Sequence, residues 1–187
     1  MNNKILLISL LIFSGIANAA SEKEMVNDSK LAIKRFSSVL KDTLKNELNK
    51  GGVTNAVTAC HSGSEAINQQ LIAQLGWKIS RTSLKVRNPK NTADAWEQQV
   101  LHNFEKSKAK GTRIKQLHYS EIIKQGKHSV FRYMQAIPIS GNCLSCHGEK
   151  IPSPVKAKLQ QLYPEDKATG YKVGDIRGAF SITRKIY

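Results

Sequence analysis

Acidic residues are few in this sequence, with 14 Asp and Glu against 29 Lys and Arg, so the formal net charge is +15. A surplus of this size favours acidic protein partners or anionic membrane surfaces as contacts. The lysines are scattered rather than gathered in blocks, so most are expected only to solvate the surface. We therefore expect at most peripheral contact with a membrane. We expect no nucleic-acid partner, because the N-terminus predicts export.

Long apolar runs are missing beyond the N-terminus, so no transmembrane helix is expected in the rest of the chain. Residues 1–19 have the features of a secretory signal peptide: basic Lys4, the apolar stretch 5–13 and the small-residue cleavage site Ala17-Asn18-Ala19. The apolar stretch is too short to cross a bilayer comfortably, which favours cleavage over an uncleaved membrane anchor. We expect a single domain of residues 20–187, located in the periplasm.

Cysteine is scarce, and its odd count of three needs an explanation in an oxidising compartment. Two of the three lie in Cys143-Leu144-Ser145-Cys146-His147, the spacing of a c-type haem attachment site. Two thiols at this spacing can add to the two vinyl groups on one edge of a haem, and the adjacent imidazole can bind the iron. Since the sequence has one such motif, it predicts one covalent haem c, with Cys143 and Cys146 as thioethers and His147 as proximal ligand.

Other uses of two closely spaced cysteines fit the sequence less well. A thioredoxin-like redox pair is expected near the start of a βαβ unit, whereas this motif lies late in the chain after a predicted hairpin. A structural zinc site needs a second Cys or His pair, which is missing. A disulfide between Cys143 and Cys146 would not require His147. Export also favours haem, because c-type haem is attached outside the cytoplasm.

The second axial position of the iron has several candidate ligands. Cys60 shares a helical face with Val53, Ala56 and Val57, so it is expected to face the interior, while His61 points about 100° away. A buried free cysteine also packs well as a small hydrophobe, so position alone leaves the role of Cys60 open. The remaining candidates, for which core packing or a surface position is the simpler interpretation, are His102, His118, His128, Met25 and Met134.

Helical periodicity is clearest in the N-terminal half. Apolar residues at helical spacing predict a helix over residues 21–50, which Gly51-Gly52 ends, and a second one from residue 54 to Gly76. A capping box at Ser62 predicts an interruption at residues 62–64. Two later helices are predicted, one capped by Thr92 and a short one that begins at residues 153–154 and ends at Pro164.

Strand patterns dominate the second half. They predict strands over residues 77–86, 117–123, 129–139 and 175–186, with a hairpin around Gly126. In the last strand Ile176, Gly178, Phe180 and Ile182 are expected to share one face. Helices followed by mainly hairpin-linked strands favour an α+β domain with an antiparallel sheet.

Several ordered blocks of this sequence resemble a family of exported, single-haem c-type haem domains with a PAS-like fold, the cyanobacterial Tll-type proteins with a Cys/His-ligated haem. The resemblance covers roughly residues 31–186. The matching blocks are Gly76-Trp77, Arg81-Thr82-Ser83-Leu84, Arg87-Asn88-Pro89, Trp96, Phe131-Arg132-Tyr133-Met134, Cys143-Leu144-Ser145-Cys146-His147-Gly148, Tyr163-Pro164, Ala168-Thr169-Gly170-Tyr171 and residues 174–181.

The resemblance implies a PAS-like antiparallel sheet flanked by N-terminal helices, with the haem beside the sheet. It implies His147 and Cys60 as the axial ligands. The arginines in the matching blocks are candidates for contact with the haem propionates, since a guanidinium suits a carboxylate, with ion pairs or surface positions as the alternative. They are Arg81, Arg87, Arg132 and Arg177.

The resemblance and the ligand set favour redox or small-ligand sensing. A thiolate ligand stabilises ferric iron, so His/Cys ligation predicts a haem of low reduction potential. If the sulfur dissociates on reduction, the vacated axial position of the iron would be open to CO or NO. No kinase or methyl-accepting segment accompanies the domain, so a sensor would act through a redox or signalling protein partner. The alternative is a periplasmic low-potential electron-transfer cytochrome c. An enzyme is less favoured, because peroxide chemistry needs an open site, and no catalytic residue is assigned.

Overall fold

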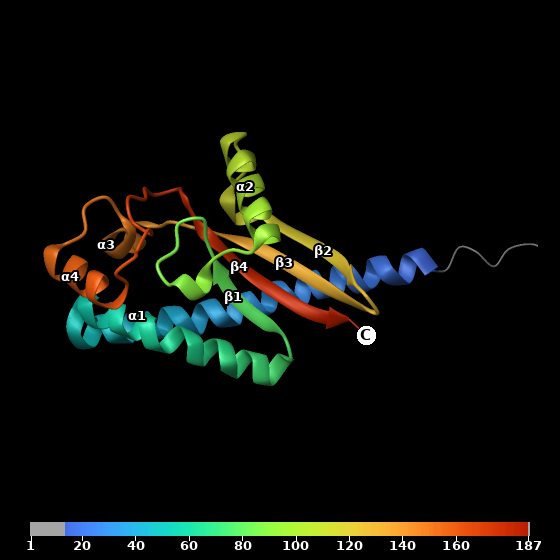
Figure 1. Ribbon diagram of the computed structural model, residues 1–187, viewed down its shortest axis with the longest axis horizontal. Helices are drawn as coiled ribbons and strands as arrows, with labels where there is room; N and C mark the ends of the chain where they lie inside the picture. Colours follow the sequence, from blue (N-terminus) through green and yellow to red (C-terminus); the bar gives the residue numbers. More distant parts are fainter. Residues whose placement is uncertain (1–13, 187) are drawn as a thin grey trace, which may run out of the picture.

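The computed structural model describes residues 14–186 (Figure 1). The elements in chain order are α1 (Ser14–Leu75), β1 (Lys78–Thr82), η1 (Pro89–Asn91), α2 (Ala95–Ala109), η2 (Ile114–Gln116), β2 (His118–Gln125), β3 (His128–Pro138), η3 (Gly141–Cys143), α3 (Leu144–His147), α4 (Ser153–Leu162) and β4 (Ile176–Ile186). Most of the predicted signal peptide, residues 1–13, lies outside the described residues, and residues 14–19 begin α1. Within the described part of the chain no helix is long and apolar enough to cross a membrane.

The four strands form one antiparallel sheet in the order β1-β4-β3-β2. The predicted hairpin around Gly126 is confirmed as β2 and β3, because Gly126 adopts the positive φ of 60° that a tight turn requires. The final predicted strand is confirmed as β4. The α+β class is therefore confirmed, while the finer PAS-like description stays a prediction.

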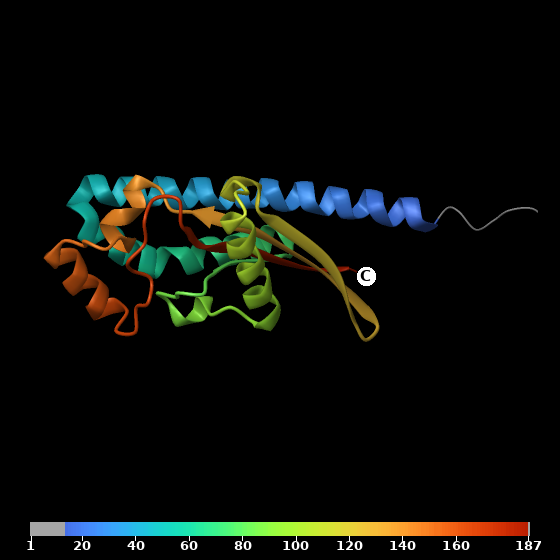
Figure 2. The ribbon, with the colours of Figure 1, turned by 90° about the horizontal axis from the view of Figure 1, so that it is seen from above.

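A sharp bend divides α1 into two arms that fold back on one another (Figures 1 and 2). Gly51 and Gly52 have non-helical backbone angles, with a φ of +68° at Gly52, as the predicted helix end requires. We call residues 14–50 the first arm and residues 53–75 the second arm. The predicted interruption at residues 62–64 is wrong, since the second arm is continuous there.

Two apolar cores lie on the two faces of the sheet. The first arm of α1 covers one face, in a core of Met25, Ala32, Ile33, Phe36, Ile79, Phe131, Tyr133 and Ile182. The helix α2 covers the other face, in a core of Ala93, Val100, Leu101, Phe104, Leu117, Met134, Ala136, Ile176 and Ala179. Neighbouring strand residues point to opposite faces, so Tyr133 and Met134 enter different cores. The sheet is thus a middle layer between α1 and α2.

The start of α2 differs from its prediction. Asp94, not Thr92, is the N-cap: its carboxylate accepts a hydrogen bond from the Glu97 amide (2.8 Å), and the Glu97 carboxylate accepts one from the Asp94 amide (3.0 Å). Thr92 instead ends η1, donating from its hydroxyl to the Pro89 carbonyl (2.6 Å). The reciprocal capping box satisfies two amides, which a single Thr cannot do.

A register shift in β4 changes which residues share a face. Ile137 pairs with Gly178, but Pro138 pairs with Ile176, so Arg177 is an extra residue without a partner in the ladder. Beyond this bulge the alternation reverses, and Ile176 packs on the α2 side while Ile182 packs on the α1 side. The predicted shared face is therefore wrong for Ile176, whereas Phe180 and Ile182 do lie on the same side of the sheet. The predicted first strand is also too long, because β1 ends at Thr82.

Gly178 is required where β1 and β4 approach closely. A Cβ at this position would lie 2.2 Å from the Thr82 carbonyl oxygen, and the φ of Gly178 is +154°. We expect Gly178→Ala to lower the free energy of unfolding by about 2 kcal/mol, measured by urea denaturation. Gly126→Ala is the matched control, since its positive φ carries strain but the space around it is open. A Gly178 variant as stable as the wild type would contradict the tight contact.

Candidate functional site

The two cysteines of the motif lie on a short helical segment between β3 and α4. Cys143 ends η3, with its sulfur 3.2 Å from the Ser140 hydroxyl, and Cys146 lies in the single turn of α3. Cys143 packs beside Ile139, Ala168 and Tyr171, whereas Cys146 packs beside Val57, Val155, Leu159 and Tyr163. None of the three cysteines, all within the described residues, forms a disulfide. The spacing of three residues on a helical turn leaves both thiols on one side of the segment.

His147 is held by a backbone carbonyl. Its Nδ1 lies 2.7 Å from the Ala168 oxygen, which can only accept a hydrogen bond, so Nδ1 carries the proton. The other ring nitrogen, Nε2, is then the atom with a lone pair for a metal. Burial, together with the guanidiniums of Arg177 and Arg87, lowers the pKa of His147 to about 3. The imidazole is therefore neutral near pH 7, as a metal ligand must be.

Cys60 lies on the second arm of α1, far from the attachment motif in the sequence, but the fold brings it close to the motif. Its thiol interacts electrostatically with the Arg81 and Arg87 guanidiniums and with Cys146, although burial dominates and raises its pKa. The second arm reaches this region because Val57, one turn earlier, packs against Val155 and other residues of α4. Cys60 is half-buried, so the prediction that it faces inward agrees with its position.

Three half-buried arginines lie around His147 and Cys60. The charges of Arg177, Arg87 and Arg81 all act on the pKa of His147. Burial lowers the pKa of Arg81 and Arg177, and among the described residues neither guanidinium has a carboxylate at ion-pair distance. Arg87 differs from them, because its Nε donates to Asp166 at 2.9 Å. Two of the arginines thus have no carboxylate partner within the described part of the chain.

Comparison with known proteins identifies the family. A family model described as Tll0287-like matches residues 17–184, which is most of the chain. The chain belongs to the Tll0287-like family. The crystal structure of the cyanobacterial heme-protein Tll0287 superposes on it with a TM-score of 0.65 and 24% sequence identity, over 88% of this chain and 96% of that one. At this identity the likeness shows a shared fold. No curated protein matches.

Arg132 of this Tll0287-like protein lies in a different place from the other three arginines. Its Nη2 donates to Asp94 (2.7 Å) and lies 3.4 Å from Glu97, and its guanidinium lies 4.1 Å from the centre of the Trp96 ring. These partners belong to the start of α2. The structure therefore brings Arg81, Arg87 and Arg177 together but not Arg132, whose two carboxylates already compensate its charge.

The other candidate axial ligands of the Tll0287-like chain lie apart from the motif or face solvent. His61 is exposed, with its ring 4.9 Å from that of Tyr163. His102 is exposed on α2, and His128 is exposed at the hairpin. Met25 is buried in the α1 core, Met134 is buried in the α2 core, and His118 stacks on Tyr133 at 5.9 Å. For all of these the simpler interpretation, packing or a surface position, agrees with the structure.

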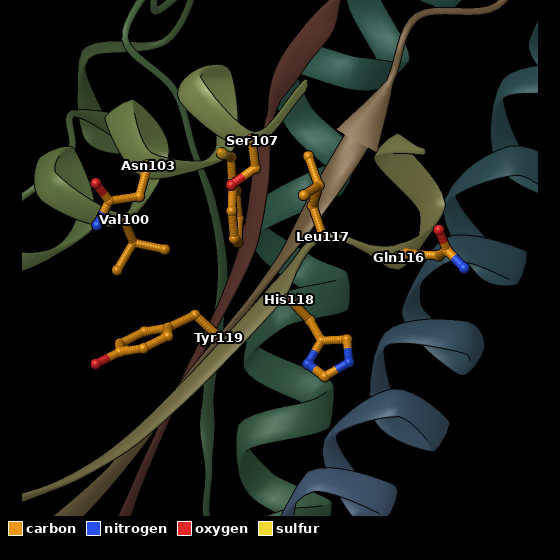
Figure 3. Close-up of a pocket in the computed structure, with 8 residues that line it drawn as sticks. Val100, Asn103, Ser107, Gln116, Leu117, His118 and Tyr119 are labelled. Carbon is orange, nitrogen blue, oxygen red and sulfur yellow. The ribbon is translucent and has the colours of Figure 1, made fainter. Parts of the chain in front are cut away.

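A cavity of about 170 Å³ lies between α2 and the start of β2 (Figure 3). Val100, Asn103 and Ser107 line it from α2, and Leu117, His118 and Tyr119 line it from the other side. Its volume is below the range of about 300 to 1,000 Å³ typical of ligand pockets. No residue of the motif lines it, so this cavity is not part of the candidate site.

Sequence reasoning missed several residues of the site. Tyr163 and Tyr171 pack against the motif, and Asp166 and Ala168 hold Arg87 and His147. All except Asp166 lie in the blocks that resemble the family. The identity of an apolar or aromatic residue in such a block does not predict which residues it contacts. Only the fold of the segment that follows α4 reveals these roles.

Proposed function

We propose that this Tll0287-like protein is an exported, periplasmic monohaem c-type haem protein. Cys143 and Cys146 would form the thioethers, His147 would be the proximal ligand, and Cys60 would be the distal ligand. The observation that carries the proposal is that His147, Cys60 and two half-buried arginines share one region of the fold, and that neither arginine has a carboxylate partner among the described residues. The description of the structurally similar Tll0287 as a heme-protein supports it.

The residues of this region fit a haem by their chemistry. Two thiols outside any disulfide lie beside a histidine whose Nδ1 is occupied and whose Nε2 has a lone pair. A buried thiol, Cys60, can supply the soft, electron-rich ligand on the opposite side. Arg81 and Arg177 lack carboxylates among the described residues, and two haem propionates would supply that negative charge.

Haem supplies one-electron redox chemistry and, where an axial side is open, binding of diatomic gases. The protein residues would decide which of these is used. Cys60 as thiolate would hold the distal side closed in the ferric state and keep the potential low. If Cys60 dissociates on reduction, CO or NO could enter, which is the behaviour of a sensor that acts through a protein partner.

Electron transfer is the second candidate function. The net charge of +15 suits docking with an acidic redox partner, and permanent Cys60 ligation in both oxidation states would suit a low-potential carrier. The two functions differ in whether the reduced protein exposes an open axial side. An enzymatic role is not proposed, because no catalytic residue is identified.

The deciding experiment is production of the wild-type protein in a periplasm that contains haem-attachment machinery. We expect haem that stays on the denatured chain and survives acidic organic extraction. The reduced protein is then exposed to CO and followed by its absorption spectrum. A new CO-bound spectrum supports sensing, an unchanged one favours electron transfer, and complete absence of covalent haem contradicts both.

The uncompensated arginines give a separate prediction. We expect Arg81→Gln and Arg177→Gln each to lower the reduction potential, because removing a positive charge near the iron favours the ferric state. Potentiometric titration of the purified holo protein measures the change. Arg132→Gln is the control, since the Arg132 guanidinium is compensated by Asp94 and Glu97 on α2. An equal drop in the control would contradict the proposed propionate contacts of Arg81 and Arg177.

A further inference from the structure

A closed set of hydrogen bonds surrounds the backbone carbonyl that holds His147. Asp166 accepts from Arg87 Nε (2.9 Å) through one carboxylate oxygen and from the Ala168 amide (2.8 Å) through the other. Arg87 Nη2 donates to the Cys146 carbonyl and to the Ala168 carbonyl, the latter at 3.3 Å. The Ala168 carbonyl accepts from His147 Nδ1. One guanidinium therefore bridges the motif and the segment that orients its imidazole.

The surrounding backbone keeps this arrangement in register. The Lys167 amide donates to the Val86 carbonyl (2.9 Å), and Lys85 Nζ donates to the Thr169 carbonyl (2.6 Å). Residues 85–87 thus each contact the segment that holds Asp166 and Ala168. On its other side this segment pairs with the motif, since the Tyr171 amide donates to the His147 carbonyl (3.0 Å).

Arg87 is poorly suited to a propionate. Its charge is already compensated by Asp166, and the two side chains are only 12% and 10% exposed. The desolvation cost of a buried ion pair can offset the attraction between its charges, so this pair is weak evidence for stability. Three of its hydrogen bonds are used on Asp166, Cys146 and Ala168, so Nε and Nη2 are occupied and only Nη1 is left for another carboxylate.

We propose that Arg87 and Asp166 are positioning residues for His147: the ion pair fixes the Ala168 carbonyl, and this carbonyl fixes the plane of the imidazole that would bind the iron. The inference rests on the proposed haem function, but it assigns Arg87 to the imidazole rather than to a propionate. Partners of a ligating histidine of this kind set both its orientation and its basicity. A change to either member of the pair should therefore release the ring.

The test uses the holo protein with Arg87→Gln, Arg87→Lys and Asp166→Asn, and Arg132→Gln as the matched control. Arg132 is also an arginine paired with carboxylates, but it lies beside the start of α2, where its Nη2 donates to Asp94 (2.7 Å) and lies 3.4 Å from Glu97. Two quantities are measured: the reduction potential, which responds to charge, and the g-values of the ferric electron paramagnetic resonance spectrum, which respond to the plane of an axial imidazole.

We expect Arg87→Gln and Asp166→Asn to shift the potential in opposite directions, because they remove opposite charges. Both are nevertheless expected to shift the ferric g-values or broaden them, since both release the Ala168 carbonyl. Arg132→Gln is expected to keep wild-type g-values, because Arg132 makes no contact with the described segment that holds Ala168. Arg87→Lys, which keeps the charge but not the fork of donors, is expected to shift the g-values with little change in potential. It also replaces Arg87→Gln if that variant does not accumulate.

Wild-type g-values in both Arg87→Gln and Asp166→Asn would overturn the positioning role, because charge alone would then explain the potentials. Equal changes of g-value in Arg132→Gln would overturn it as well. Failure of the proposed function looks different, since the wild-type protein would then carry no covalent haem. A haem-loaded wild type with unaffected variants would overturn only the role of Arg87 and Asp166.

Discussion

Protein with both Cys143→Ser and Cys146→Ser is expected to contain essentially no covalently bound haem. The serine hydroxyl is close in size to the thiol but does not add to a vinyl group, so neither thioether can form. Both side chains are partly exposed, and neither forms a disulfide, so the fold around them should survive the change. The measurement is haem content per chain after denaturation, from the alkaline pyridine spectrum.

The two single variants and a Cys60 control test the assignment of each thioether separately. Cys143→Ser and Cys146→Ser alone should each leave one thioether, which shifts the absorption of the pyridine complex because one vinyl group remains. Cys60→Ser should keep both thioethers, since Cys60 lies outside the motif. A double variant that still holds haem after denaturation would contradict the assignment of Cys143 and Cys146.

Cys60→Ala is expected to alter the ferric spectrum and to raise the reduction potential. A thiolate donates electron density and stabilises ferric iron, so its loss favours the reduced state. Axial ligands set haem potentials over about 0.8 V, so we expect an increase on the order of 0.1 V or more. Electron paramagnetic resonance of the ferric protein and potentiometric titration measure the two effects.

His61→Ala is the matched control for Cys60→Ala. His61 is the next residue on the same helix, but it is exposed and contacts the ring of Tyr163. Its removal should leave the ferric spectrum of the wild type. An unchanged ferric spectrum in Cys60→Ala would contradict Cys60 as a ligand, and a spectrum that changes only in His61→Ala would point to the imidazole instead.

Features that depend on neighbouring residues were predictable from the sequence. Gly51-Gly52 ends a helix and Gly126 turns a hairpin, because glycine alone adopts these backbone angles without strain. The attachment motif is likewise local, since two thiols and an imidazole within five residues suffice to suggest its chemistry. The local prediction at Thr92 was wrong because the reciprocal capping box of Asp94 and Glu97 begins α2 instead. At residues 62–64 the helix continues through the predicted interruption.

Features that join distant segments were not predictable in the same way. Four arginines in matching blocks were equivalent candidates for a propionate, and only their neighbours distinguish them: carboxylates of α2 surround Arg132, Asp166 pairs with Arg87, and Arg81 and Arg177 lack such partners among the described residues. The bulge in β4 makes Arg177 an extra residue in the strand. The alternation of apolar and polar residues in the sequence did not predict this bulge.

By itself, the sequence determined the motif, the helical face of Cys60 and the α+β class, because these follow from spacing along the chain. The tertiary structure decided that the second arm of α1 brings Cys60 towards Cys146 and that Ala168 holds the Nδ1 of His147. It also decided that Asp166 compensates Arg87, whereas no carboxylate of the described residues pairs with Arg81. The physical reason is that burial and charge compensation depend on which segments meet. That depends on packing over the whole sheet, and not on the neighbours of any one residue.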